Sequence, residues 1–355
     1  MINFDKKFWE GKKVFITGHT GFKGSWLCII LNNLKAKIHG FSLKPKKKSL
    51  YNQSRIGKNL SSSTFGDISN IKLLKKKIKI IKPEIIFHLA AQPLVIDSYK
   101  NPLETFQTNI MGTVNLLECL RDIDSIKSVV IITTDKVYKI NKKNKSYSEL
   151  DELGGNDPYS SSKVGVEIAV NSYVKSFFQK TNLKNRISTV RAGNVVGGGD
   201  YSENRLLPDI IKSINSNSKL KIRNPNSIRP WQHVIEPLVG YLILAEYQFK
   251  GKIFEKNNAW NFGPNKDNSK KVIDIIKIMQ KFNFFNLVIR KNKKYKETEV
   301  LKLNSNKSIK KLKWHPKMTL QSTLKEVFDW NLKVKNLESA KEVCEKQFLM
   351  YINKK

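Results

Sequence analysis

The sequence has 355 residues and a formal net charge of +35 at pH 7, because 65 Lys and Arg face 30 Asp and Glu. Lysine far outnumbers arginine and is spread along the whole chain, which predicts lysine-rich solvated faces and a positive field for small anions rather than a nucleic-acid interface. No apolar run approaches the length of a membrane span, no basic and apolar leader opens the chain, and the three cysteines form no CxxC pair, so we expect a cytoplasmic protein with no membrane partner and no metal.

The first predicted element is a strand, a turn and a helix over residues 13–34. The turn carries glycines at Gly18, Gly21 and Gly24, between an apolar strand and a helix with an apolar face. Glycine permits positive φ and a close approach of backbone to a pyrophosphate, and a helix N-terminus attracts phosphate. The pattern predicts a dinucleotide-binding turn rather than an ordinary tight turn.

The next two strands are expected on the adenosine side of this site. The strand over residues 37–41 is followed by Ser42 and Lys44 with no carboxylate to hold a ribose, which leaves both NAD and NADP open. A third strand ends at Asp67, which we expect near the adenine amino group with Ile68 against the ring. The alternative is that Asp67 caps the helix that follows.

Two buried strands follow, at residues 84–90 and 128–134, separated by an amphipathic helix over residues 101–121. Their apolar runs are typical of parallel strands, and His88 is expected to be a core histidine. Because strands and helices alternate, we predict an α/β fold with a Rossmann-type, doubly wound parallel sheet and a ligand crevice at the carboxyl ends of its strands. The residues expected there beside the glycine turn are Ala90, Ala91, Gln92, Thr133, Thr134, Asp135 and Lys136.

A helix that ends near Gln179 begins with Tyr159 and Lys163, one turn apart. Both side chains lie on one face, so the lysine is expected to lower the pKa of the tyrosine and make it a base for an alcohol proton. Two further Tyr-x-x-x-Lys matches, at Tyr138 in a charged loop and Tyr351 in the tail, are expected by chance.

Beyond a sixth strand at residues 187–191 the pattern becomes irregular. Residues 192–199 are expected to form a glycine-rich loop at the edge of the crevice. In residues 228–234, Arg229 suits a phosphate, and Trp231 suits either stacking on a nucleotide or a place in the core.

These residues resemble the extended short-chain dehydrogenase/reductase superfamily and, within it, the CDP-glucose 4,6-dehydratases, from about Phe8 to Trp330. The motifs that carry the resemblance are TGHTGFKG, LAAQ, TTDK, YSSSK and RAGNVVGGGD followed by RPWQHV. The resemblance implies tightly held NAD, with cofactor contacts from Gly18, Thr20, Gly21, Phe22, Lys23, Gly24, Ser42, Asp67, Ile68, Leu89, Ala90, Ala91, Thr133, Tyr159 and Lys163. The substrate contacts that it implies are Gln92, Asn194, Arg205 and Arg229.

The resemblance also implies a three-step reaction on CDP-glucose. Tyr159, assisted by Lys163 and Thr134, takes the 4-hydroxyl proton while NAD accepts the C4 hydride. Asp135 protonates the departing 6-hydroxyl as C5 loses a proton, and the hydride returns to C6; such an acid needs a raised pKa and hence a desolvated site. Lys136 stands where dTDP-glucose dehydratases carry a Glu base, and it acts either as a neutral base or as a cation beside the enolate.

The expected organisation is an NAD-binding Rossmann domain over residues 1–191 joined by 234–261, a smaller nucleotide-sugar domain over 192–233 and 262–335, and a C-terminal helix or tail over 336–355 that frays after about Lys346. A homodimer or higher oligomer is expected through the helices at 101–121 and 159–179, unless the monomer itself covers them. The enzyme would be a cytoplasmic hydro-lyase of deoxysugar biosynthesis, of the kind that supplies lipopolysaccharide O-antigen.

Two alternatives remain open. One is another nucleotide-sugar 4,6-dehydratase or a 4-epimerase of the same superfamily, and an epimerase would not need Asp135. The other is a non-catalytic Rossmann protein that senses NAD or binds nucleic acid, which would not need the catalytic set of Thr134, Asp135, Lys136, Tyr159 and Lys163.

Overall fold

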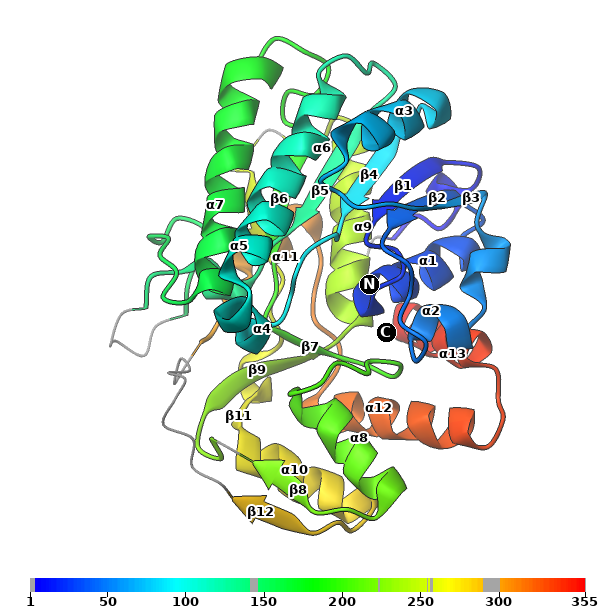
Figure 1. The fold of residues 1–355 in the computed structure, drawn as a ribbon, viewed down its shortest axis with the longest axis vertical. Coiled ribbons are helices and arrows are strands. Elements are labelled where there is room, and N and C mark those ends of the chain that lie inside the picture. The colour runs from blue at the N-terminus through cyan, green and yellow to red at the C-terminus, as the bar shows by residue number, and fades with distance from the viewer. Residues whose placement is uncertain are drawn as a thin grey trace.

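The centre of the fold is a parallel β-sheet in the upper part of Figure 1. The computed structural model describes residues 4–140, 146–222, 224–253, 255, 258–289 and 301–354. Within these ranges seven strands pair in parallel in the order β10 (Ala259–Asn261), β6 (Ile187–Arg191), β5 (Ser128–Ile132), β4 (Ile85–His88), β1 (Lys13–Thr17), β2 (Lys37–Ser42) and β3 (Ser62–Phe65). The predicted doubly wound α/β fold is confirmed, and the chain reverses its progression across the sheet between β1 and β4, where such folds bind ligands.

Helices cover both faces of this sheet, so its central strands are buried on both sides. Phe15 of β1 packs into one hydrophobic cluster and Ile16 into the other. The helices on the Phe15 side are α3 (Ile71–Ile81), α6 (Gly112–Leu120) and α7 (Pro158–Tyr173), and those on the Ile16 side are α1 (Phe22–Asn33) and α9 (Ile235–Phe249). His88 is confirmed as a core histidine, because its ring nitrogens bond the hydroxyls of Thr17 and Thr113 at 2.7 and 3.0 Å.

The predicted helix at residues 101–121 consists of several segments. It begins as α5 (Pro102–Phe106), passes through a π-helical turn (Gln107–Met111) and continues as α6; α7 passes in the same way into a π-helical turn (Val174–Phe178). The remaining short helices and 3₁₀ turns of this part are Lys7–Trp9, α2 (Leu50–Gln53), Ile56–Asn59, α4 (Val95–Lys100) and Asp135–Val137. No helix among the described residues has the length and apolar character needed to cross a membrane.

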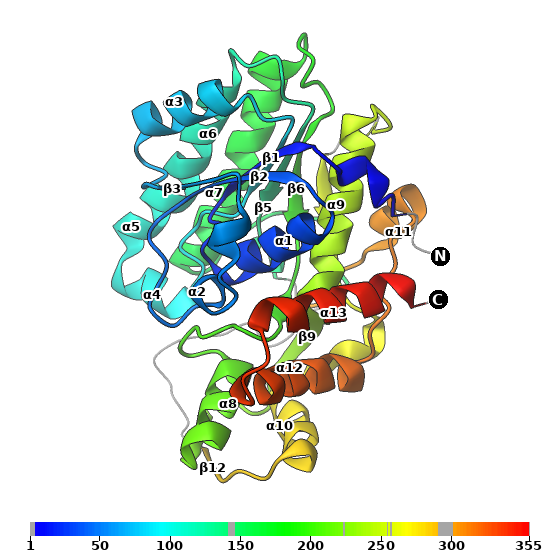
Figure 2. The same ribbon diagram turned by 90° about the vertical axis from the view of Figure 1, so that its right-hand side faces the viewer.

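A smaller substructure lies below the main sheet in Figure 1. Its elements are β7 (Asn194–Val196), α8 (Leu206–Ser216), β8 (Leu220–Ile222), β9 (Ile228–His233), Lys266–Asn268, β11 (Ser269–Lys271), α10 (Val272–Phe282), β12 (Leu287–Ile289) and α12 (Leu320–Lys335). The helix α11 (Asn306–Leu312) packs instead against α9 and against β10 of the main sheet (Figure 2). The loop predicted at residues 192–199 is partly wrong, because Asn194 to Val196 form a strand that pairs in parallel with β9. Val195 and Val196 are buried, which favours a strand there despite the glycines on either side.

The C-terminal helix α13 (Ala340–Asn353) belongs to the core. It packs between α1 and α12, and Figure 2 shows it in red across the middle of the molecule. Cys344, Phe348 and Tyr351 are buried. The prediction that the chain frays after Lys346 is therefore wrong, because apolar side chains one helical turn apart dock this segment in spite of its lysines.

Truncation of Phe348 to alanine is predicted to lower the free energy of unfolding by about 3–5 kcal/mol, because its side chain is fully buried and packs edge-on against Phe4. Leu349→Ala is the matched control: Leu349 is 37% exposed, and its loss should cost less than about 1 kcal/mol. Urea denaturation of the full chain measures both. Equal, small effects would mean that the end of α13 contributes little to the core.

Candidate active site

The turn between β1 and α1 is packed so closely that two of its glycines leave no room for a side chain. Gly18 has a φ of +74°, and a Cβ there would lie 2.7 Å from the backbone nitrogen of Ala90 at the end of β4. A Cβ on Gly24 would lie 2.1 Å from the oxygen of Gly18. The first turn of α1 thus presents bare backbone to the strand ends, which is the cradle that a dinucleotide pyrophosphate requires.

The residues expected on the adenosine side lie around the ends of β2 and β3. The hydroxyls of Ser42 and Thr20 share a hydrogen bond of 2.8 Å. Asp67 is exposed, Ile68 is buried, and Asn70 rather than Asp67 caps α3 through its side chain. The alternative role of Asp67 as the helix cap is therefore wrong, and its carboxylate accepts a hydrogen bond from the backbone N–H of Ser69 at 2.7 Å.

The segment after β4 lies against the glycine turn. Leu89 and Ala90 line the back of Gly18, and Ala91 is partly exposed beside them. Gln92, expected to contact substrate, has its side-chain amide engaged within the protein: the nitrogen donates to the hydroxyl of Thr105 at 2.9 Å and to the backbone oxygen of residue 94 at 3.1 Å. Gln92 thereby shapes the wall of the crevice.

Asp135 lies buried just beyond the end of β5. One of its carboxyl oxygens accepts a hydrogen bond from the hydroxyl of Thr134 at 3.1 Å. Burial raises the pKa of the Asp135 carboxyl, and the nearby charges of Lys136, Arg229 and Lys23 only partly oppose this rise. The desolvated site predicted for Asp135 is confirmed, with Lys136 partly buried next to it.

Tyr159 and Lys163 enter the same crevice from the first turns of α7, whose N-terminus is capped by the Asp157 side chain. Burial raises the pKa of the Tyr159 phenol to about 12, against the lowering effects of Thr134 and a more distant arginine. The ammonium of Lys163 donates to the backbone oxygen of Ile132 at 3.1 Å, and burial lowers its pKa to about 8. The predicted lowering of the Tyr159 pKa is wrong, because burial outweighs the neighbouring groups.

A buried ion pair supports the crevice from behind, and the sequence analysis missed it. Glu167 of α7 receives hydrogen bonds from Nε and Nη2 of Arg191 at 2.8 and 3.0 Å and from the hydroxyl of Thr133 at 2.7 Å. Thr133, expected to contact the cofactor, thus donates to Glu167. A charged residue at the end of the apolar strand 187–191 was the available signal, because a buried arginine requires a partner.

The residues expected to hold the substrate come from the smaller substructure. Arg205, at the N-terminus of α8, pairs with Asp200 at 3.1 Å. Arg229 is buried in β9 near Asp135, and Asn194 begins β7. Trp231 is confirmed as a core anchor and not a stacking platform: it is 3% exposed and donates to a backbone oxygen of β11.

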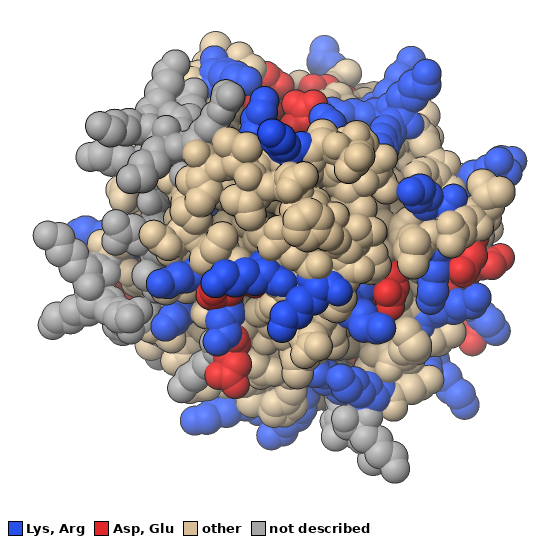
Figure 3. Space-filling view, turned by 90° about the horizontal axis from the view of Figure 1, so that it is seen from below, with Lys and Arg blue, Asp and Glu red and all other residues tan. Residues whose placement is uncertain are grey.

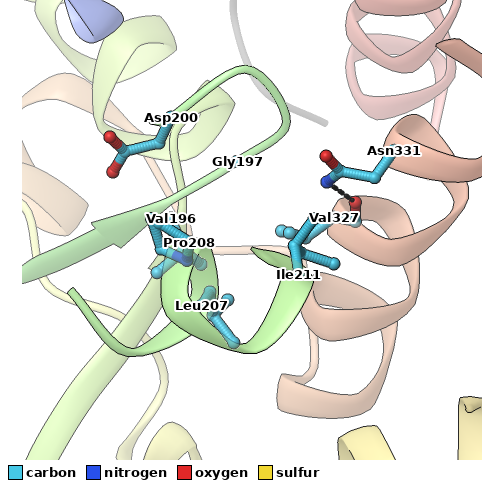
Figure 4. A pocket seen from close by; sticks show the side chains of 8 residues that line it. All are labelled: Val196, Gly197, Asp200, Leu207, Pro208, Ile211, Val327 and Asn331. Atoms are coloured by element: carbon cyan, nitrogen blue, oxygen red, sulfur yellow. Dashed lines mark hydrogen bonds between the residues drawn. The ribbon is translucent and has the colours of Figure 1, made fainter. Parts of the chain in front are cut away.

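A separate small pocket lies between β7, α8 and α12, and Figure 4 shows its mainly apolar lining. Val196, Leu207 and Val327 contribute to that lining, and Asn331 donates within its own helix. Asp200 links this pocket to the crevice through its pair with Arg205. The chemistry-bearing residues lie outside it, in the crevice.

Lysine and arginine side chains are scattered over the face shown in Figure 3, among uncharged residues and a few carboxylates. This distribution matches the even spread of lysine along the sequence. It favours a general attraction for anions over a defined polyanion groove.

The chain matches the family model described as GDP-mannose 4,6 dehydratase over residues 15–327. It is 43% identical over 334 residues to the CDP-glucose 4,6-dehydratase of Salmonella typhimurium, covering 92% of each chain. Among solved structures, the dTDP-glucose 4,6-dehydratase of Bacillus anthracis in complex with NAD gives a TM-score of 0.77 at 24% identity, over 94% of this chain and 100% of the other. The UDP-glucose 4-epimerase of Thermotoga maritima with UDP-glucose gives a TM-score of 0.78 at 21% identity, over 92% of this chain and 99% of the other. Both structures share the fold described above.

Replacing Glu167 with glutamine is predicted to lower the free energy of unfolding by about 3–5 kcal/mol at neutral pH, because it leaves the buried charge of Arg191 unpaired. Glu152→Gln is the matched control: it breaks an exposed 2.7 Å pair with Lys139 and should cost less than about 1 kcal/mol. Chemical denaturation measures both.

The same ion pair predicts a pH dependence. Burial alone would raise the pKa of Glu167. Arg191 and two hydroxyls lower it by more than burial raises it, so the pKa in the folded protein lies below the usual 4.5. Its stabilisation is therefore present above pH 4.5 and is lost as the pH falls through the folded pKa. The difference in free energy of unfolding between Glu167→Gln and the wild type should therefore shrink on acidification. A difference that stays constant would contradict this assignment.

Proposed function

The chain belongs to the GDP-mannose 4,6-dehydratase family, and from this membership we propose that it converts CDP-glucose to CDP-4-keto-6-deoxyglucose. The observation that carries the proposal is the buried carboxyl of Asp135, hydrogen bonded to Thr134 and close to Tyr159 at the strand ends. A protonated acid in that place serves water elimination, which oxidation alone does not need. The 43% identity over 92% of each chain to a CDP-glucose 4,6-dehydratase supports the choice of nucleotide.

The residues of the crevice fit NAD. Gly18 and Gly24 leave the bare backbone that a pyrophosphate needs, while Ser42, Asp67 and Ile68 would hold the adenosine end. The other proposed contacts are Thr20, Gly21, Phe22, Lys23, Leu89, Ala90, Ala91, Thr133, Tyr159 and Lys163. Bound NAD would supply the hydride acceptor for C4 and later the hydride donor for C6.

Tyr159 is proposed as the base that takes the 4-hydroxyl proton. Its phenol pKa of about 12 means that it is protonated in the chain alone at neutral pH. The Lys163 ammonium, held by the oxygen of Ile132, lies one helical turn away, and a hydrogen bond with Thr134 lowers the pKa of the phenol. These groups would stabilise the phenolate as the sugar enters and the remaining water leaves.

Asp135 is proposed as the acid in the elimination. C5 loses its proton, the electron pair forms the C5–C6 double bond, the C6–O bond breaks, and the Asp135 proton converts the leaving hydroxyl into water. Burial raises the pKa of this carboxyl and so favours the protonated form that the step uses. Lys136, partly buried beside it, is proposed to act at C5, as the base or as the cation that stabilises the enolate.

The substrate is proposed to bind between the main sheet and the smaller substructure. Arg205 and Arg229 would contact the diphosphate, with Asn194 and Gln92 at the sugar. We propose the division stated from the sequence, with residues 1–191 and 234–261 for NAD and 192–233 and 262–335 for the nucleotide sugar. The return of β10 to the main sheet beside β6 supports that division.

We propose a homodimer formed through α5, α6 and α7. Leu103 of α5, Met111 of the π-helical turn between α5 and α6, and Ile168 of α7 are 50% or more exposed, and covering them would bury apolar surface. A cytoplasmic location and a place in deoxysugar biosynthesis, including supply of lipopolysaccharide O-antigen, complete the proposal. The three buried, unpaired cysteines support a reducing compartment.

Two variants are predicted to separate the steps. Tyr159→Phe should abolish C4 oxidation, because it removes the proton acceptor. Asp135→Asn should leave oxidation intact but slow elimination by a factor of about 10²–10⁴, because general-acid assistance is lost. Absorbance of the reduced cofactor in stopped flow, together with product analysis by NMR, measures both. Near-normal turnover in either variant would contradict the assigned roles.

A substrate panel tests the proposed function itself. Purified protein with NAD should form a 4-keto-6-deoxy product from CDP-glucose at a higher kcat/KM than from dTDP-glucose, UDP-glucose or GDP-mannose. Inversion at C4 without loss of water would instead make the chain an epimerase. No reaction with any of the four, together with NAD binding, would favour the non-catalytic alternative.

A further inference from the structure

Gly193 lies in the link between β6 and β7, in contact with both Asp135 and Pro230. A Cβ at this position would lie 2.6 Å from Cγ of Pro230 and 3.0 Å from Oδ2 of Asp135. Both distances are shorter than the ordinary contact between non-bonded heavy atoms. A side chain therefore fits here only if one of these two neighbours moves.

Any movement that relieves this contact falls on one of two groups at the crevice, the Pro230 ring or the Asp135 carboxyl. Pro230 is a rigid ring within β9, which pairs with both β7 and β11. The backbone N–H of Asp135 donates to the oxygen of Ala192 at 3.1 Å, and its carboxyl accepts from Thr134. Gly193 itself has no left-handed φ, so its backbone accepts alanine and the contacts alone oppose a side chain.

The contact also joins the two halves of the proposed site. Pro230 follows Arg229, the proposed diphosphate ligand, on the same strand, and the charge of Arg229 acts on Asp135. A shift of the Pro230 backbone would carry Arg229 with it, and a rotation of Asp135 would turn its carboxyl away from Thr134. The empty space at Gly193 thus determines where acid and diphosphate ligand lie relative to each other.

We propose that Gly193 is a positioning residue for the elimination step. Because it has no side chain, the Asp135 carboxyl can lie between Thr134 and β9, in line with the leaving 6-hydroxyl. This inference rests on the dehydratase function proposed above. It assigns Gly193 no contact with substrate or cofactor, so its effect passes through Asp135.

Gly193→Ala tests the proposal, because the proposal predicts which step of the reaction becomes slower. Stopped flow with NAD and CDP-glucose should show reduced cofactor forming at nearly the wild-type rate, while dehydration slows by about 10²-fold, the cost of roughly a 1 Å misplacement. KM should stay near the wild-type value if the Asp135 carboxyl alone turns away. A KM that rises while the ratio of oxidation to elimination stays at the wild-type value would show that Arg229 moves instead, and would contradict the proposal. Wild-type turnover in Gly193→Ala would overturn the proposal.

Gly263→Ala is the matched control. Its Cβ would meet Leu303 at 2.8 Å and Ser305 at 3.3 Å, a similar clash outside the crevice. It should lower thermal stability as much as Gly193→Ala does while leaving the ratio of oxidation to elimination at the wild-type value. If both variants slow oxidation and elimination alike, the effect of Gly193→Ala is general destabilisation and the proposal fails.

Pro230→Ala provides a rescue. It removes the ring atom closest to the added methyl, so Gly193→Ala/Pro230→Ala should recover at least about tenfold of the lost elimination rate, since the methyl can then move away from Asp135. Absence of any rescue would overturn the steric argument.

A crystal structure of Gly193→Ala separates this inference from the proposed function. If the wild type dehydrates no nucleotide hexose, the function fails, yet a displaced Asp135 carboxyl in the variant still supports the positioning role. An unmoved Asp135 carboxyl contradicts the inference whatever the wild type does.

Discussion

The close approach of Gly18 to the backbone of Leu89 and Ala90 is the contact on which the site depends. Because Gly18 has no Cβ, the turn after β1 can lie directly on the end of β4. The helix α1 then begins with its free N–H groups facing the strand ends. The strand order reverses at this same place, so the loops after β4, β5 and β6 surround one crevice. The residues proposed for the chemistry extend from that edge, from the first turns of α7 or from the substructure that closes the crevice.

Burial then determines the protonation states within the crevice. It raises the pKa of the Asp135 carboxyl, raises that of the Tyr159 phenol to about 12, and lowers that of Lys163 to about 8. Burial thus favours the protonated form of Asp135 that elimination needs, whereas Tyr159 must be activated as the site fills. The pair of Glu167 and Arg191 lies behind these groups and fixes α7 to β6 through directed hydrogen bonds.

The sequence was sufficient where a local pattern has one physical meaning. Glycines between a strand and a helix, and apolar runs in alternation with helices, predicted the sheet, the turn and the edge that carries Asp135 and Tyr159. It was insufficient where tertiary contacts determine the role or the partner of a side chain. The sequence around Trp231 fits a stacking ring and a core side chain equally well. In α13 the lysines make the apolar face centred on Phe348 difficult to recognise in the sequence. The partner of Arg191 lies 24 positions away in the chain, and only the fold brings the two together.

In the proposed reaction one crevice oxidises C4, removes water across C5 and C6 and returns the same hydride to C6. The most direct measurement is the reaction of CDP-glucose deuterated at C4 with the purified protein and NAD, followed by mass spectrometry and NMR of the product. We expect loss of water with the deuterium at C6 of the same molecule. Inversion at C4 with all the water retained, or a dehydrated product without deuterium at C6, would contradict it.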